Sequence, residues 1–205
     1  MSETLSRILA DRLVAVVRTD STDGLAEVVS ALAEGGVSIV EITLTIPRAL
    51  DAIRRLASNC LIGAGTVLDA ETAERAIDAG AQFIVSPILN LEVIRICRTR
   101  NVVVMPGAYT PTEIVAAWDA GADVVKVFPA DSLGPTYFKA LRGPLPHVRM
   151  MPTGGVDLTT AKPFLEAGAC CLGVGGKLVD PVAIRNRDFA TLTMLAQQFR
   201  KIVTN

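Results

Sequence analysis

A lysine inside an apolar run is the residue of this sequence best suited to do chemistry. Lys126 lies in Val124-Val125-Lys126-Val127-Phe128, which reads as a short buried strand. Alternate residues of a strand share a face, so Lys126 would lie between Val124 and Phe128. Burial disfavours the charged ammonium form, and the neutral amine can form a Schiff base with a carbonyl compound. The alternative is a lysine whose stem is buried and whose amine reaches solvent at the strand end.

Glu41 is the carboxylate that would complement this amine. It lies in Ile39-Val40-Glu41-Ile42-Thr43, so Glu41 shares one strand face with Ile39 and Thr43. A buried carboxylate without a partner is costly, and a buried amine is the obvious partner. Glu41 would then act as general acid and base. The alternative is a structural Glu–Lys pair with no role in catalysis.

Two glycine pairs follow the last two strand-like runs. The first is Thr153-Gly154-Gly155, and the second closes Gly173-Val174-Gly175-Gly176. Glycines at such places let backbone N–H groups approach and bind a phosphate, although turn geometry alone would also explain them. Lys177 could add charge to this anion site or could face solvent.

Short β-branched runs alternate with longer amphipathic segments along the whole chain. The strands are predicted near Leu13–Arg18, Ser38–Leu44, Leu61–Gly65, Phe83–Ser86, Val102–Met105, Val124–Phe128, Val148–Met151 and Cys170–Gly173. The helices are predicted over Asp23–Glu34, Pro47–Ala57, Ala70–Ala79, Leu91–Thr99, Pro111–Ala120, Gly134–Leu141, Leu158–Ala167 and Asp188–Val203. Proposed helix N-caps are Thr22-Asp23, Thr110 before Pro111, and Asp157.

An internal repeat supports this alternation. Gly36, Gly80, Gly121 and Gly168 each end a helical segment before the next strand, at intervals of 41 to 47 residues, and each interval holds two βα units. Eight such units predict an α/β fold, a (β/α)8 TIM barrel with an extra N-terminal helix, formed by residues 1–205 as one domain. A doubly wound open sheet is the alternative.

Chemistry in such barrels gathers at the C-terminal ends of the strands. These ends supply one carboxylate, one amine, one guanidinium, several hydroxyls and the glycine pairs: Arg18, Glu41, Thr43, Thr66, Ser86-Pro87, Pro106-Gly107, Lys126, Phe128, Thr153-Gly154-Gly155 and Gly175-Gly176. Arg18 could hold a substrate carboxylate through two hydrogen bonds. The alternative for Arg18 is a surface ion pair with Asp20 or Asp23.

Composition excludes several classes of function. A net charge of −1 gives no reason to expect nucleic acid or a membrane surface as partner. We see no secretory signal and no apolar run of membrane-spanning length, which favours a cytoplasmic protein. The four cysteines show no CxxC spacing and the single histidine, His147, lies in a loop, so neither a disulfide framework nor a metal site is indicated.

Taken together, these motifs resemble the class I aldolases of 2-keto-3-deoxy-6-phosphogluconate (KDPG) and 4-hydroxy-2-oxoglutarate (KHG). The resemblance covers nearly the whole chain and rests on Glu41-Ile42-Thr43-Leu44, Gly63-Ala64-Gly65-Thr66-Val67, Ser86-Pro87, Met105-Pro106-Gly107, Lys126-Val127-Phe128-Pro129, Pro152-Thr153-Gly154-Gly155-Val156 and Gly173-Val174-Gly175. It implies a metal-independent lyase without a cofactor, on a (β/α)8 barrel that is usually a homotrimer.

The resemblance also implies roles for individual residues. Lys126 would form the Schiff base and Glu41 would move protons. Thr66, Pro87 and Phe128 would line the pyruvate pocket, and Thr153, Gly154 and Gly155 would reach toward the far end of the substrate. Two positions differ from the family pattern. Thr45 stands where some members have an arginine for the pyruvate carboxylate, which leaves Arg18 as its substitute, and Gly176 stands where many members have a serine.

The expected reaction is reversible cleavage of KDPG to pyruvate and glyceraldehyde 3-phosphate. The nearest alternative is cleavage of KHG, or of a related 2-keto-4-hydroxy acid, for which no phosphate site is needed. A phosphate-binding isomerase or decarboxylase would explain the glycine pairs but not the apolar surroundings of Lys126. A catalytically silent barrel that forms assemblies is the non-enzymatic alternative.

Overall fold

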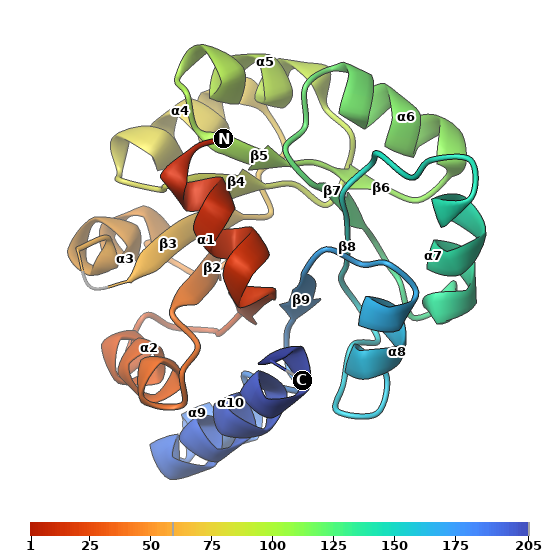
Figure 1. The fold of residues 1–205 in the computed structure, drawn as a ribbon. Coiled ribbons are helices and arrows are strands. Elements are labelled where there is room, and N and C mark those ends of the chain that lie inside the picture. Colours follow the sequence, from red (N-terminus) through yellow and green to blue (C-terminus); the bar gives the residue numbers. More distant parts are fainter. Residues whose placement is uncertain (59, 205) are drawn as a thin grey trace.

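The computed structural model describes residues 1–58 and 60–204. Its strands are β1 (Leu13–Val17), β2 (Ile39–Thr43), β3 (Leu61–Gly65), β4 (Phe83–Val85), β5 (Val103–Met105), β6 (Gly107–Ala108), β7 (Val125–Val127), β8 (Met150–Pro152) and β9 (Leu172–Val174). All pairings between them are parallel, in the orders β5-β4-β3-β2-β1-β9 and β6-β7-β8. A bridge between Thr153 and Gly173 joins the second sheet to β9, so the predicted (β/α)8 barrel is confirmed (Figure 1).

The fifth predicted strand is interrupted at Pro106, a difference from the prediction. A proline has no N–H to donate to a neighbouring strand. At this point the chain changes partners: Met105 accepts a hydrogen bond from Ser86 N (3.1 Å), whereas Pro106 accepts one from Lys126 N (2.9 Å). Strand β5 therefore pairs with β4, and β6 pairs with β7.

Strand alternation divides the buried residues into two layers. Val14, Ile39, Leu61 and Phe83 belong to the cluster that fills the barrel interior. Their neighbours in sequence pack in the larger cluster between strands and helices, and they include Ala15, Val40, Ile62 and Ile84. This period of two places every odd-numbered residue of β2 inside the barrel.

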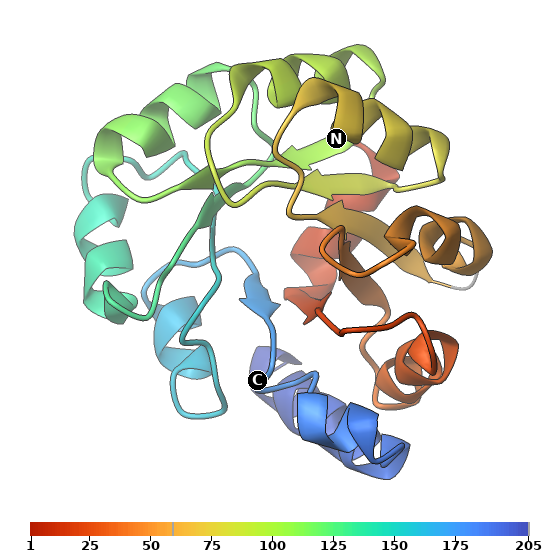
Figure 2. The same ribbon diagram turned by 180° about the vertical axis from the view of Figure 1, so that it is seen from behind.

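The helices surround the barrel, with the first at one end of it. They are α1 (Glu3–Asp11), α2 (Leu25–Glu34), α3 (Ala49–Leu56), α4 (Ala70–Asp78), α5 (Leu91–Thr99), α6 (Pro111–Asp119), α7 (Gly134–Arg142), α8 (Ala161–Glu166), α9 (Pro181–Arg185) and α10 (Phe189–Thr204). In Figure 2, which views the barrel from its other end, the helices form the outer ring and α1 lies behind the strands. None of the described helices is long and apolar enough to cross a membrane.

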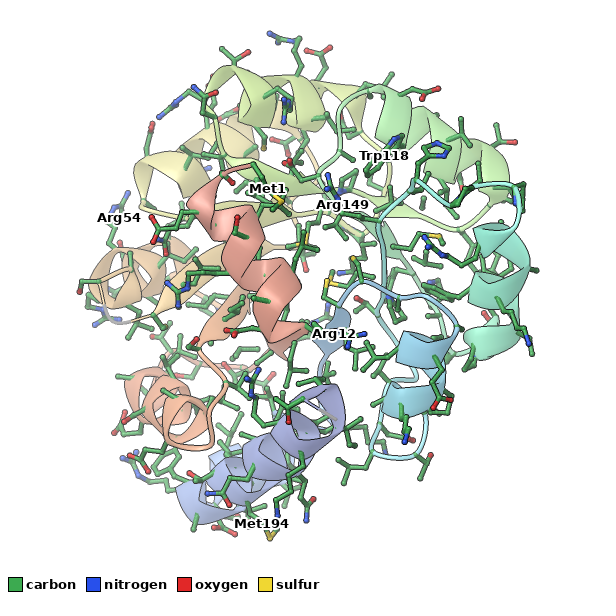
Figure 3. All side chains as sticks on the ribbon, viewed as in Figure 1. Met1, Arg12, Arg54, Trp118, Arg149 and Met194 are labelled. Carbon is green, nitrogen blue, oxygen red and sulfur yellow. The ribbon has the colours of Figure 1, made fainter. Side chains whose placement is uncertain are left out.

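The predicted extra helix is α1, which covers the N-terminal end of the barrel. Its Leu5 and Ile8 are buried in the interior cluster. Figure 3 shows α1 crossing this end between Met1 and Arg12. Ser2 begins the helix by accepting a hydrogen bond from Leu5 N (3.2 Å). Loops surround the opposite end of the barrel, where the strands finish.

Several helix boundaries differ from the prediction. The repeat glycines are confirmed as helix ends, since Gly36, Gly80, Gly121 and Gly168 all have φ between 87° and 101°, as left-handed C-terminal residues do. Asp157 does not cap α8: its carboxylate accepts hydrogen bonds from Thr159 N and Thr160 N, and this turn delays the helix to Ala161. Helix α2 likewise begins after Gly24 rather than after Thr22-Asp23. The short helix α9, capped by Asp180, was not predicted.

Candidate functional site

Lys126 and Glu41 meet inside the barrel. Lys126 is the central residue of β7, and Glu41 is the central residue of β2. Their side chains are 6% and 1% exposed, and Lys126 Nζ lies 3.9 Å from Glu41 Oε1. The prediction that alternation turns both side chains inward is therefore confirmed. The alternative in which the amine reaches solvent is wrong.

The carboxylate of Glu41 has no hydrogen bond in the described part of the chain. Both of its oxygens are buried without such a partner, and so is Thr153 Oγ1. Native proteins seldom leave buried polar atoms unpaired, because the desolvation penalty is then not offset. The Glu41 carboxylate lies beside the amine, and Thr153 directly follows β8 at the barrel mouth, so a bound molecule could supply the missing hydrogen bonds.

Phe128 covers the lysine on the mouth side. Its ring centroid lies 5.1 Å from Lys126 Nζ, within the range of a cation–π contact. The residue follows β7, and its peptide bond to Pro129 is cis. The amine therefore has an aromatic face on one side and a carboxylate on another.

A cavity of about 240 Å³ opens beside Phe128, and neither Lys126 nor Glu41 is among the residues that line it. It is lined by the ends of β1, β8 and β9 and by Phe128: Val16, Arg18, Phe128, Thr153, Gly154, Gly155, Val156, Gly173, Gly175, Gly176 and Lys177. Arg18 is exposed and makes no ion pair with any described residue, so the predicted alternative of a bridge to Asp20 or Asp23 is wrong. Lys177 is exposed as well and lines the cavity.

The glycine pair after β8 is required by its backbone conformation. Gly154 and Gly155 have φ of 89° and 69°, values that other residues rarely adopt. A Cβ at Gly155 would also lie 2.6 Å from Asp131 Cα. Gly175 and Gly176 are less crowded, since a Cβ on either meets nothing closer than 3.8 Å. The two pairs thus give the cavity a wall with no side chains.

Nearly the whole chain matches a known protein family. The model of the KDPG and KHG aldolase family matches residues 5–195. A 2-dehydro-3-deoxy-phosphogluconate aldolase of Treponema pallidum (strain Nichols) is 38% identical to the chain, and the match covers 98% of this chain and 96% of that protein. The chain belongs to the KDPG and KHG aldolase family. Aldolases are lyases, so the chain is a lyase, as the resemblance implied.

Solved structures of this aldolase family superpose closely on the chain. A 4-hydroxy-2-oxoglutarate/2-dehydro-3-deoxyphosphogluconate aldolase from TTHB1 has a TM-score of 0.88 and 30% identity, with 98% of this chain and 99% of that chain covered. A KDPG aldolase from Legionella pneumophila, with pyruvate captured at low pH as a covalent carbinolamine intermediate, has a TM-score of 0.86 and 27% identity, with 96% and 97% covered.

Three other predicted site residues of this aldolase lie on the opposite arc of the mouth. Thr43, Thr66 and Pro87 follow one another on the neighbouring strands β2, β3 and β4 or just after them, and none of them lines the 240 Å³ cavity. Thr43 is buried, and its Oγ1 lies 3.0 Å from Thr45 Oγ1. Thr66 is half-buried with φ of 61°, a backbone conformation that is unusual for a β-branched residue.

One residue next to Glu41, Gly65, is not among the site residues that the sequence predicts. Gly65 lies beside Glu41 on β3, and a Cβ there would overlap the Glu41 carboxylate. The available signal was the pair Gly63 and Gly65, two glycines on one face of a strand next to the one that holds Glu41. An interior strand face without side chains makes room for something larger from its neighbour.

Proposed function

We propose that this chain is a class I aldolase that reversibly cleaves KDPG to pyruvate and glyceraldehyde 3-phosphate. The observation that carries the proposal is the buried Lys126 amine 3.9 Å from the Glu41 carboxylate at the centre of the barrel. A buried lysine can serve as a Schiff-base nucleophile. A neighbouring carboxylate can move the protons that Schiff-base chemistry requires.

The reaction proceeds through an iminium ion on Lys126. The amine adds to the C2 ketone of the substrate, and loss of water gives the iminium. Glu41 takes the proton of the C4 hydroxyl as the C3–C4 bond breaks, the aldehyde leaves, and the bonding electrons pass into an enamine. Protonation of that enamine at C3 and hydrolysis release pyruvate and return the amine.

The other site residues bind the two ends of the substrate. Around the pyruvate part we place Phe128, Thr43, Thr66 and Pro87, with Arg18 for the carboxylate. Around the aldehyde part we place the wall of the cavity: Thr153, Gly154, Gly155, Gly175 and Gly176. Backbone N–H groups of such glycines suit a phosphate.

Trapping the Schiff base tests the proposal. Borohydride added with pyruvate should reduce the iminium and leave a stable adduct on the peptide that contains Lys126. Lys126→Arg should abolish the adduct, and Lys177→Arg, at the exposed lysine that lines the cavity beside Phe128, should keep it. An adduct on another peptide, or none, would overturn the assignment.

KHG, which yields pyruvate and glyoxylate, is the second candidate substrate. The observation in its favour is Gly176, an exposed cavity residue that offers no hydroxyl to a phosphate. The ratio of kcat/KM for KDPG and KHG decides between the two, because only KDPG gains from an anion site at the aldehyde end.

We further infer that residues 1–205 act as one domain in a cytoplasmic homotrimer. Four large apolar side chains are exposed after neighbouring strands on the mouth side, a feature that often marks contact between subunits: Leu68, Ile88, Leu91 and Tyr109. Light scattering should give a mass three times that of the 21.7 kDa chain, and a monomeric mass would overturn this inference.

A further inference from the structure

Gly65 provides the space in which the Glu41 carboxylate lies. A Cβ at Gly65 would overlap Oε1 of Glu41 and would come within 2.6 Å of its Cγ. In the strand register Glu41 pairs with Gly63, and Thr43 pairs with Gly65. The Glu41 side chain therefore extends over β3 toward the barrel mouth, past its register partner Gly63 to Gly65. It occupies the space that a side chain at residue 65 would fill.

The same arrangement recurs on the other side of the site. A Cβ at Gly173 of β9 would overlap Thr153 Oγ1, across the bridge that joins these two residues. Among the described residues, the buried side-chain oxygens without a hydrogen bond belong to Glu41 and Thr153 alone. Each therefore lies over a glycine of the adjacent strand, where no side-chain atom of that strand restrains or pairs with it.

We propose that Gly65 is a positioning residue, whose missing side chain allows Glu41 to hold its carboxylate 3.9 Å from the Lys126 amine. The inference rests on the proposed function, in which Glu41 moves protons. A methyl group at residue 65 would push the carboxylate out of its place, and a displacement of about 1 Å in a catalytic group can cost about 100-fold in rate.

Gly63 shows what a glycine that serves packing alone looks like on this strand. It lies on the same face of β3, two residues deeper in the barrel, and a Cβ there would overlap the ring of Phe83. Phe83 belongs to the apolar interior cluster and carries no group that could transfer a proton. Gly63→Ala is therefore the matched control for Gly65→Ala: it has the same strand, face and added methyl group.

The first measurement compares these two variants. Gly65→Ala should lower kcat for cleavage and the rate of pyruvate methyl-proton exchange by about 100-fold, while borohydride still labels Lys126. Gly63→Ala should lower stability to urea but should keep kcat within threefold of the wild-type value. Here kcat is calculated per active enzyme molecule, counted as the molecules that pyruvate and borohydride label. A Gly65→Ala enzyme with wild-type kcat, or an equal loss in Gly63→Ala, would overturn the proposal.

The second measurement is a double-mutant cycle with Glu41→Ala, whose side chain ends at Cβ and leaves the space over residue 65 without the Cγ and carboxylate that a methyl group there would meet. Adding Gly65→Ala to Glu41→Ala should cost less than threefold in kcat, against about 100-fold in the wild-type background. Should Gly65→Ala fail to fold, this comparison still decides, since a 100-fold loss in the Glu41→Ala background contradicts the proposal. Absence of the Lys126 adduct in the wild type would instead refute the proposed function.

Discussion

At the scale of single residues, the geometry of the Lys126–Glu41 pair is unfavourable for stabilising the folded state. Both side chains are almost fully buried, so both have lost their hydration. The 3.9 Å separation exceeds the 2.7–2.9 Å of a charge-assisted hydrogen bond, and the Glu41 oxygens have no other hydrogen bond in the described chain. A buried pair recovers its desolvation penalty only with good geometry and further hydrogen bonds. This pair has neither, which agrees with a role in catalysis.

The residue-scale prediction concerns Glu41→Gln. The amide keeps the shape of the carboxylate but cannot take up a proton, so we expect an intact fold and a kcat about 10²- to 10⁴-fold lower. Pyruvate release should be measured beside the urea midpoint, which should not fall because the carboxylate contributes no hydrogen bond. Turnover at the wild-type rate would remove Glu41 from the mechanism.

At the scale of elements, helix α6 shows how a strand end is fixed at the mouth. Thr110 Oγ1 accepts a hydrogen bond from Glu113 N (3.3 Å). The Glu113 carboxylate accepts hydrogen bonds from Thr110 N (2.7 Å) and from Tyr109 N (2.9 Å), which directly follows β6. These hydrogen bonds hold the pKa of Glu113 below its usual range, and the bond from Thr110 N has the largest effect. The capping box thus ties the start of α6 to the end of β6, beside β7 and Lys126.

The element-scale prediction is a pH dependence of stability. Because the pKa of Glu113 is lower in the folded state, its contribution is complete above the unfolded-state value of about 4.3. That contribution is lost as pH falls through the folded-state pKa. Between pH 6 and pH 3 the free energy of unfolding should therefore fall less in Glu113→Gln than in the wild type. The difference between the two decreases should be less than about 1 kcal/mol, because the carboxylate is largely in water.

Urea unfolding at both pH values measures this difference. Asp119→Asn, at the other end of α6, is the control, because no described residue donates a hydrogen bond to Asp119. It should lose as much stability on acidification as the wild type does. If acidification lowers the free energy of unfolding of Glu113→Gln as much as that of the wild type and of Asp119→Asn, the capping carboxylate does not stabilise the native state.

At the scale of the whole molecule, the barrel is closed by side chains at one end and open to ligands at the other. Leu5 and Ile8 of α1 join the interior cluster from the N-terminal end, where Val14, Leu61 and Cys171 also lie. Glu41 and Lys126 lie beyond this apolar plug, on the side where the strands end. The plug closes the barrel behind the site, so the Lys126–Glu41 pair can be reached only through the mouth.

The whole-molecule prediction separates stability from chemistry. Ile8→Ala should lower the free energy of unfolding by about 2–5 kcal/mol, because the residue is fully buried and a cavity would remain. The exposed Ala10→Ser on the same helix should change it by less than about 0.5 kcal/mol. Urea unfolding gives both values. The kcat of folded Ile8→Ala should equal that of the wild type, and a large loss would mean that the plug also positions the site.

Local patterns in the sequence determined a large part of this protein. Period-two alternation put Glu41 and Lys126 on inward strand faces, and the recurring glycines marked the helix ends, because both depend only on neighbours along the chain. The break at Pro106, the late start of α8 and the added helix α9 needed the structure, because hydrogen bonds to neighbouring segments decide them.

Tertiary structure alone decided how the site residues meet. Glu41 and Lys126 come from β2 and β7, which do not pair with each other, so their 3.9 Å separation follows from closure of the barrel. Gly65 acquires its role only through the register of β3 against β2. A sequence states which way a side chain points on its own strand, whereas distances across a barrel depend on the strand register that all the strands set together.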